Sequence, residues 1–80
     1  MSPTVFRSGS FRFHFFSREE PRMHVHVVAN DGDEAKFWLE PRVELAVNYG
    51  LNDRELRLIQ RLVEGRIEEI RDAWRQHFEP

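Results

Sequence analysis

Two stretches near the start of the chain, residues 11–16 and 23–28, alternate between apolar and polar side chains. Such an alternation with a period of two is typical of β-strands that have one buried and one wetter face. The apolar set consists of Phe11, Phe13, Phe15, Met23, Val25 and Val27. Since His14, His24 and His26 fall in the other set, we expect a hairpin that carries three histidines on its open side.

Further strands are predicted before and after this hairpin. A short strand over residues 4–7 precedes a turn at residues 8–10, where glycine tolerates the backbone conformation that a tight turn needs. A strong Asn-Asp-Gly-Asp turn at residues 30–33 leads into a fourth strand over residues 35–39. Residues 43–47 again alternate, with Val, Leu and Val in one set, and are expected to form a fifth strand.

The pattern changes to helical spacing after Gly50. Asn52 is a good N-cap, and Glu55 stands at the position that completes a capping box. Apolar residues then recur at steps of three and four, namely Leu56, Ile59, Val63, Ile67, Ile70, Trp74 and Phe78. This stripe predicts one amphipathic helix to about residue 78. Gly65 costs roughly 1 kcal/mol relative to alanine in a helix interior, and we expect a bend there rather than a break because the stripe keeps its phase.

These elements predict a single α+β domain over residues 1–80. An antiparallel β-meander of four to five strands would be packed on one face by a long C-terminal helix, because the apolar sheet face and the helix stripe each need a partner. Phe37 and Leu39 extend the apolar face. The other sheet face would stay open and would carry Arg12, His14, His24, His26, Lys36, Trp38 and Glu40.

The expected strand register gathers several of these side chains. If the phenylalanines face Met23, Val25 and Val27, His14 must lie opposite His24 or His26. The same rule in the next hairpin places Trp38 beside His26 and Glu40 beside His24. Directly opposed residues have Cβ atoms about 4.5–5.5 Å apart, so the five side chains would occupy a small area.

Composition excludes several classes of protein. There is no cysteine, so disulfides and thiolate chemistry are absent, and the net charge of −2 argues against coating nucleic acid by charge alone. The N-terminus lacks a secretory signal and no apolar run approaches the roughly 20 residues of a membrane span, which favours the cytoplasm. All basic residues except Lys36 are arginine, as expected from a GC-rich genome or from planar contacts to carboxylate or phosphate.

The open face is the candidate site, and no catalytic residue is assigned. Its candidate binding surface consists of Arg12, His14, Phe16, His24, His26, Trp38 and Glu40. An exposed indole with a phenyl ring, rimmed by arginine and histidine, has the composition of a protein-binding hot spot. The alternative without a ligand is that the imidazoles stack on a half-buried strand face beside Trp38 and Phe16.

A metal site is a further alternative. His24 and His26 lie on one side of a strand and could supply two imidazole ligands to zinc, with His14 and Glu40 as additional candidates. This arrangement would suit a metal-dependent or histidine-driven hydrolase or nuclease. The serines lie in the tail or in turns, and no glycine-rich phosphate loop is present, so other catalytic classes gain no support.

The order of several segments points to a family. They are residues 3–7, 13–17, 21–27, 34–41 and 56–74. The chain resembles the small bacterial proteins grouped as DUF 4160, a domain of unknown function. Its most specific segment is a proline followed by His-x-His. In this chain Arg22 replaces the second proline usual in the family, and residues 17–20 replace an aspartate–histidine pair.

The resemblance implies a small cytoplasmic protein, often encoded beside another short protein, for which membership of toxin–antitoxin modules has been suggested. A protein partner, such as the product of the adjacent gene, and a homodimer are therefore the expected partners. Nucleic acid is not indicated by the residues, and no cofactor is expected unless the zinc alternative holds.

Overall fold

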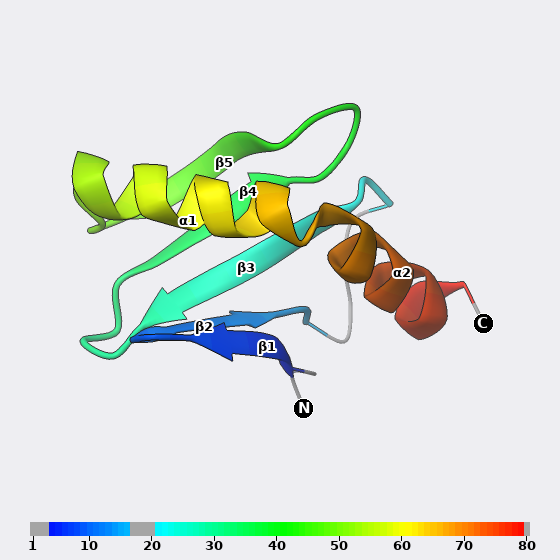
Figure 1. Ribbon diagram of the computed structural model, residues 1–80, viewed down its shortest axis with the longest axis horizontal. Coiled ribbons are helices and arrows are strands. Elements are labelled where there is room, and N and C mark those ends of the chain that lie inside the picture. The colour runs from blue at the N-terminus through cyan, green and yellow to red at the C-terminus, as the bar shows by residue number, and fades with distance from the viewer. Residues whose placement is uncertain (1–3, 17–20, 80) are drawn as a thin grey trace.

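The five strands pair in the order in which they occur along the chain. The computed structural model describes residues 4–16 and 21–79. Its strands are β1 (Thr4–Ser8), β2 (Phe11–His14), β3 (His24–Ala29), β4 (Glu34–Trp38) and β5 (Glu44–Tyr49). Every neighbouring pair is antiparallel, in the sheet order β1-β2-β3-β4-β5 (Figure 1). The predicted α+β meander is confirmed, and the fifth strand is part of it.

The first hairpin turns at Gly9 and Ser10. Ser8 pairs with Phe11, so the loop has two residues. Gly9 has a φ of 58°, whereas no described residue other than glycine has a positive φ. This combination corresponds to a type II′ turn, in which glycine takes the first central position. Strand β2 then ends at His14, two residues earlier than expected, and the predicted polar loop at residues 17–22 lies mostly outside the described residues.

The C-terminal segment begins as the sequence predicts. Helix α1 spans Asp53–Gly65, and both hydrogen bonds of the capping box are present. The backbone N–H of Glu55 donates to Asn52 Oδ1 at 2.8 Å, and the N–H of Asn52 donates to Glu55 Oε1 at 3.1 Å. Two orphan amides of the first turn are thereby satisfied, which fixes where the helix starts.

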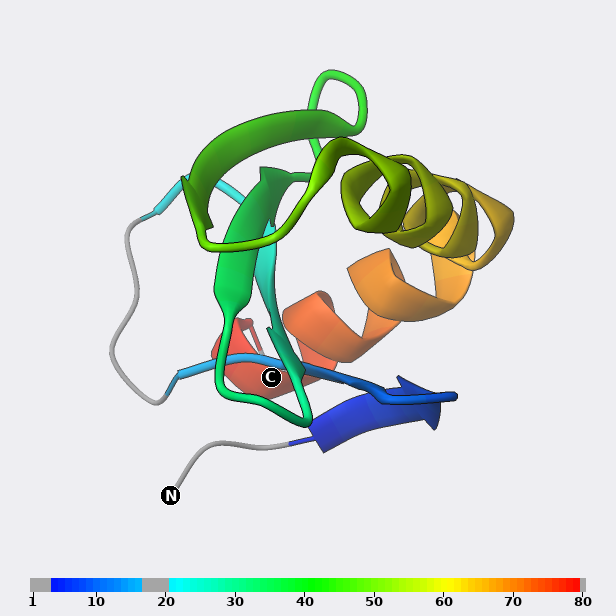
Figure 2. The same ribbon diagram turned by 90° about the vertical axis from the view of Figure 1, so that its left-hand side faces the viewer.

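The expected single bent helix is wrong. Helix α1 ends at Gly65, and a second helix, α2, spans Ile67–Phe78. Arg66 between them has φ −122° and ψ 24°, and its N–H bonds back to Val63 O at 3.2 Å in a tightened last turn. The two segments run in different directions over the sheet (Figure 2). A break is favoured over a bend because each half of the stripe then faces its own part of the twisted sheet.

Both helices cover the same side of the sheet (Figures 1 and 2). Every residue of the predicted apolar face is buried, and these residues form one cluster with the helices. The helices contribute the buried side chains Ile59, Val63, Ile70 and Trp74. No helix among the described residues is both long and apolar enough to cross a membrane.

The fifth strand contains an irregularity that changes which side its residues face. Lys36 pairs with Val47, but the next residue of β4, Phe37, pairs with Leu45, so Ala46 is an extra residue in β5. Such a β-bulge reverses the phase of the side chains beyond it. The expected single apolar set of Val43, Leu45 and Val47 is therefore divided between the two faces of the sheet.

Candidate functional site

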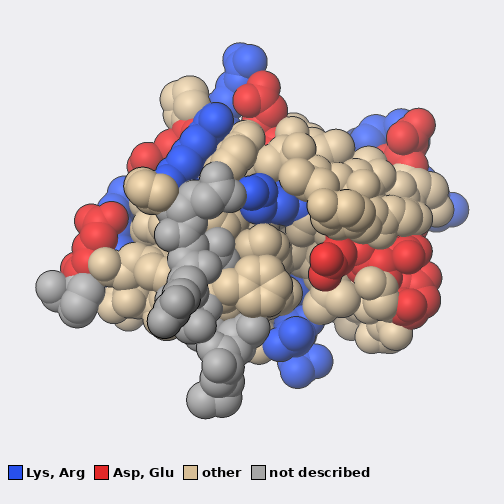
Figure 3. All heavy atoms as spheres, turned by 180° about the vertical axis from the view of Figure 1, so that it is seen from behind, with Lys and Arg blue, Asp and Glu red and all other residues tan. Residues whose placement is uncertain are grey.

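The strand register shows which side chains occupy the sheet face opposite the two helices. We call it the uncovered face, because no helix of the described part of the chain packs on it. Cross-strand partners share a face. One row of partners contains Arg7, Arg12, Val28, Glu34 and Tyr49. The next row contains Thr4, His14, His26, Lys36 and Val47, and a third contains His24, Trp38 and Glu44. Residues other than Lys, Arg, Asp and Glu make up much of what can be seen of this side in Figure 3, which views the molecule from behind.

The three histidines gather as the alternation predicts. His14 lies opposite His26, which was one of the two expected pairings. Their ring centroids are 5.6 Å apart, and those of His24 and His26 are 5.0 Å apart. Phe16 joins them edge-on, with its centroid 4.3 Å from that of His26. The cluster is thus built by adjacent strands β2 and β3 and by the residues that follow β2.

Two of these histidines are buried, contrary to the expectation of an open imidazole surface. His24 is 0% exposed and His14 is 4% exposed. Because β2 ends at His14, no residue of β2 pairs with His24, and Trp74 of α2 approaches the His24 ring to 5.2 Å between centroids. His26 is partly exposed, so it is the most accessible imidazole of the three.

A backbone contact sets the tautomer of His24. Its Nδ1 lies 2.7 Å from the carbonyl oxygen of Arg22. A carbonyl oxygen can only accept a hydrogen bond, so Nδ1 carries the proton and donates. The His24 ring is therefore held in place by a hydrogen bond to the segment that precedes β3.

The predicted pairing of Trp38 with His26 and of Glu40 with His24 is wrong, because the register of β4 against β3 differs by two residues. Trp38 lies beside His24, and Lys36 takes the place beside His26. The loop between β3 and β4 is closed by a hydrogen bond from the N–H of Ala29 to the carbonyl of Asp33, so β3 turns one residue earlier than assumed. Such a shift of the loop changes every pairing in the hairpin.

Glu40 lies outside β4 and does not reach the histidines by strand pairing. It is exposed, and its carbonyl oxygen accepts from Arg22 Nε at 3.3 Å and from an Arg22 Nη at 3.2 Å. The same guanidinium stacks on Trp38 at 4.1 Å from the ring centroid, and Lys36 Nζ lies 4.7 Å from it. The indole is therefore partly covered by two cations, each contributing about 0.5–1 kcal/mol at such a site.

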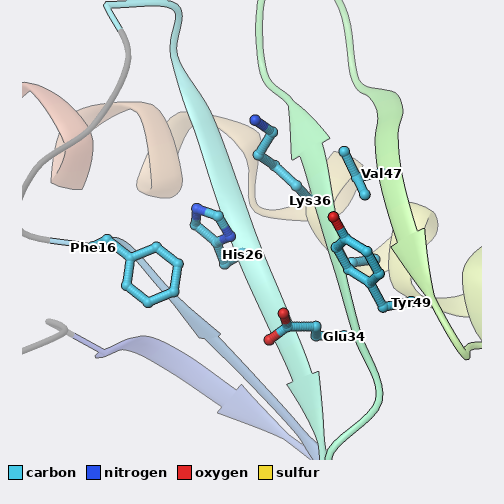
Figure 4. Close-up of a pocket in the computed structure, with 7 residues that line it drawn as sticks. Phe16, His26, Glu34, Lys36, Val47 and Tyr49 are labelled. Atoms are coloured by element: carbon cyan, nitrogen blue, oxygen red, sulfur yellow. The ribbon is translucent and has the colours of Figure 1, made fainter.

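A shallow hollow opens on the uncovered face between β3 and β5 (Figure 4). It encloses about 140 Å³, and its lining includes Phe16, His26, Lys36, Val47 and Tyr49. Phe16 is 41% exposed and Tyr49 is 63% exposed. We call this feature the aromatic hollow. Sequence analysis found Phe16 and His26 but missed Val47 and Tyr49, because the bulge at Ala46 leaves no mark in the alternation.

The described part of the chain supplies too few ligands for the zinc site considered as an alternative. Within residues 4–16 and 21–79, no group of three or more His, Asp or Glu side chains is arranged to hold a metal ion. His24 and His26 bring two imidazoles together, whereas a catalytic zinc usually has three protein ligands and a structural zinc four. Arg12, the remaining predicted residue, lies at the other end of the face, where its Nη1 donates to Thr4 Oγ1 at 3.2 Å.

Comparison with known proteins adds one finding. The family model described as "Domain of unknown function (DUF4160)" matches residues 10–75. The chain belongs to the DUF4160 family. The match runs from the first turn of the sheet into α2 and includes every residue of the aromatic hollow. The resemblance predicted from the sequence is thereby confirmed, and the family description names no activity.

No curated protein and no solved structure gives a significant match to this DUF4160 chain.

Proposed function

We propose that this DUF4160 protein is a binding module that holds a protein partner against its uncovered sheet face. The observation that carries the proposal is the aromatic hollow, with two exposed rings beside it on a face opposite both helices. Exposed aromatic side chains next to a concave surface, with charged residues around them, are the usual composition of a binding hot spot.

The size of the hollow favours a side chain of a partner over a small-molecule substrate. Ligand pockets usually measure about 300–1,000 Å³, whereas the aromatic hollow encloses about 140 Å³. One aliphatic or aromatic side chain would fill such a space. Phe16 and His26, in edge-to-face contact at 4.3 Å, would form one wall, and Val47 and Tyr49 the other.

Charged groups beside the hollow would set the orientation of that partner. Lys36 and Glu34 both line it and carry opposite charges (Figure 4). Rim charges of this kind contribute more to specificity and association rate than to affinity. We infer that the partner places an apolar side chain in the hollow and polar groups around it.

The partner that we propose is the small protein encoded by the adjacent gene, as a component of a toxin–antitoxin type pair in the cytoplasm. This identity follows from the family resemblance, whereas the position of the contact follows from the hollow. The alternative partner for the same face is a second copy of the chain, which would make the protein a homodimer.

The proposal is tested by measuring the affinity of the full chain for the adjacent gene product by titration calorimetry. Tyr49→Ala and Phe16→Ala should each weaken binding, by about thirtyfold if each ring contributes the roughly 2 kcal/mol of a hot-spot residue. Leu58→Ala is the matched control, because Leu58 is an exposed apolar residue, 48% accessible, on α1.

Two results would contradict this function. One is wild-type affinity in both aromatic variants. The other is a loss of affinity in Leu58→Ala equal to that in Tyr49→Ala. Sedimentation equilibrium of the protein alone distinguishes the second occupant, since a dimer through this face would dissociate in the Tyr49→Ala variant.

A further inference from the structure

Two arginines face each other at the end of the uncovered face farthest from Trp38. Arg7 of β1 and Arg12 of β2 are direct cross-strand partners. Like charges in this position are destabilising, so an ion-pair partner is expected for each. Among the described residues, neither guanidinium lies within 4.0 Å of a carboxylate oxygen. The hydrogen bond that holds Arg12 goes to the uncharged hydroxyl of Thr4.

The acidic residues of the nearby β3–β4 turn are engaged elsewhere. Asp31 Oδ1 accepts the backbone N–H of Asp33 at 3.1 Å. The carboxylate of Asp33 lies against Gly50, the residue that directly follows β5. Glu34 lines the aromatic hollow. Among the described residues, none of these three carboxylates forms an ion pair with Arg7 or Arg12.

The arginine pair borders a second hollow, which we call the arginine hollow. It encloses about 240 Å³, which is larger than the aromatic hollow, and its walls are mostly polar. Besides Arg7 and Arg12, it is lined by Gly9 and Ser10 of the first turn and by Asn30 of the second. Guanidinium groups and turn residues with free access to solvent thus surround one concave space.

We propose that the arginine hollow binds a phosphate group. Two guanidiniums carry two positive charges, which a phosphate dianion balances, whereas a single carboxylate would leave one charge uncompensated. The planar guanidinium forms paired hydrogen bonds to phosphate oxygens. Binding would also offset the repulsion expected between like charges on directly paired residues.

The phosphate has two sources, a free phosphate or the backbone of a single-stranded RNA. A free phosphate would present a dianion to Arg7 and Arg12, whereas an RNA strand would present phosphodiesters with one negative charge each, so two of them would be needed to balance the pair. The site lies apart from the aromatic hollow, so it does not depend on the proposed protein partner. The chain's net charge of −2 means that attraction would come from this local pair of charges rather than from the whole surface.

The test is an NMR titration of the full chain with inorganic phosphate at constant ionic strength. Saturable shifts are expected at the backbone amides of Gly9, Ser10 and Arg12. Arg7→Gln and Arg12→Gln should each weaken binding about tenfold or more, since each removes charged hydrogen bonds. Arg42→Gln is the control, because Arg42 is highly exposed in the β4–β5 connection and pairs with Glu44.

Thermal unfolding separates a lost site from a damaged fold. Without phosphate, Arg7→Gln should raise the Tm, because the repulsion is gone. With phosphate, the wild type and Arg42→Gln should gain stability through ligand binding, and the Arg7→Gln and Arg12→Gln variants should lose that gain. Shifts that do not saturate, or equal affinity in the wild type and Arg12→Gln, would overturn the proposal.

A short single-stranded RNA identifies the source of the phosphate. Binding of the RNA at least tenfold tighter than inorganic phosphate, and lost in Arg12→Gln, would assign the site to an RNA strand. Equal affinities per phosphate would assign it to a free phosphate. Absence of binding to both probes would overturn the proposal.

Discussion

Two glycine-to-alanine substitutions should change stability in opposite directions, because the backbone differs at the two positions. Gly65 closes α1 in a helical conformation, and a Cβ built there meets no atom within 4 Å. Alanine is favoured over glycine in a helix by up to about 1 kcal/mol and also restricts the unfolded chain. We therefore expect Gly65→Ala to stabilise the protein by about 0.5–1 kcal/mol.

Gly50 differs from Gly65 in its backbone conformation and in the space available for a Cβ. Its φ is +99°, a conformation that side chains rarely adopt, and a Cβ would lie 2.5 Å from Asp33 Oδ1. Strain of this kind costs on the order of 1–3 kcal/mol. In a domain of this size 1 kcal/mol corresponds to a Tm shift of roughly 4–8 °C. Gly50→Ala should therefore lower the Tm by at least about 4 °C, whereas Gly65→Ala should raise it by about 2–8 °C.

Circular dichroism during heating measures both shifts under identical conditions. The Asp33→Ala background isolates the backbone contribution, because it removes the carboxylate that a Cβ at position 50 would meet. Gly50→Ala should stay destabilising in that background, since the positive φ persists. A destabilised Gly65→Ala variant would refute the reasoning by showing that the junction between α1 and α2 requires glycine.

Two further substitutions test contacts that hold the helices in place. Asn52→Ala removes the side-chain half of the capping box and should lower the free energy of unfolding in urea by about 1 kcal/mol; an unchanged value would contradict the assigned cap. Arg71→Ala removes a guanidinium that donates to Leu39 O at 2.8 and 3.3 Å, and it should cost about 1.5–3 kcal/mol in the same assay. Arg75→Ala, which loses a surface pair with Asp72, is its control and should stay within about 0.5 kcal/mol; equal losses in the two variants would argue against the Leu39 contact.

Local patterns were enough to predict the layers of this fold. The alternation over residues 11–15 and 23–27 assigns the buried face correctly, since each of these phenylalanines and valines lies in the core. Asn52 and Glu55 mark the start of α1 because both capping bonds form within four residues. Strand alternation and helix capping depend on residues that are close together along the chain, so both can be recognised in the sequence.

Features that depend on contacts across space could not be predicted in the same way. The one-residue difference at the β3–β4 loop moved Trp38 from His26 to His24. The bulge at Ala46 placed Val47 and Tyr49 on the uncovered face without altering the hydrophobic pattern. Trp74 approaches His24 from α2, a separate helix that begins at Ile67 after the break at Arg66. The aromatic hollow depends on both the β3–β4 register and the bulge at Ala46. The sequence therefore predicted only some of the residues that line it.

The order of the elements along the chain has a consequence for synthesis on the ribosome. All five strands precede both helices, and each strand pairs with the one just made. At about 5–20 residues per second, the segment from 53 to 78 takes roughly 1–5 s to be translated. During that interval the phenylalanine-rich side of the nascent sheet lacks its cover. The newborn chain thus passes through a short period of exposure to aggregation and to chaperone capture, which ends when the last helix docks.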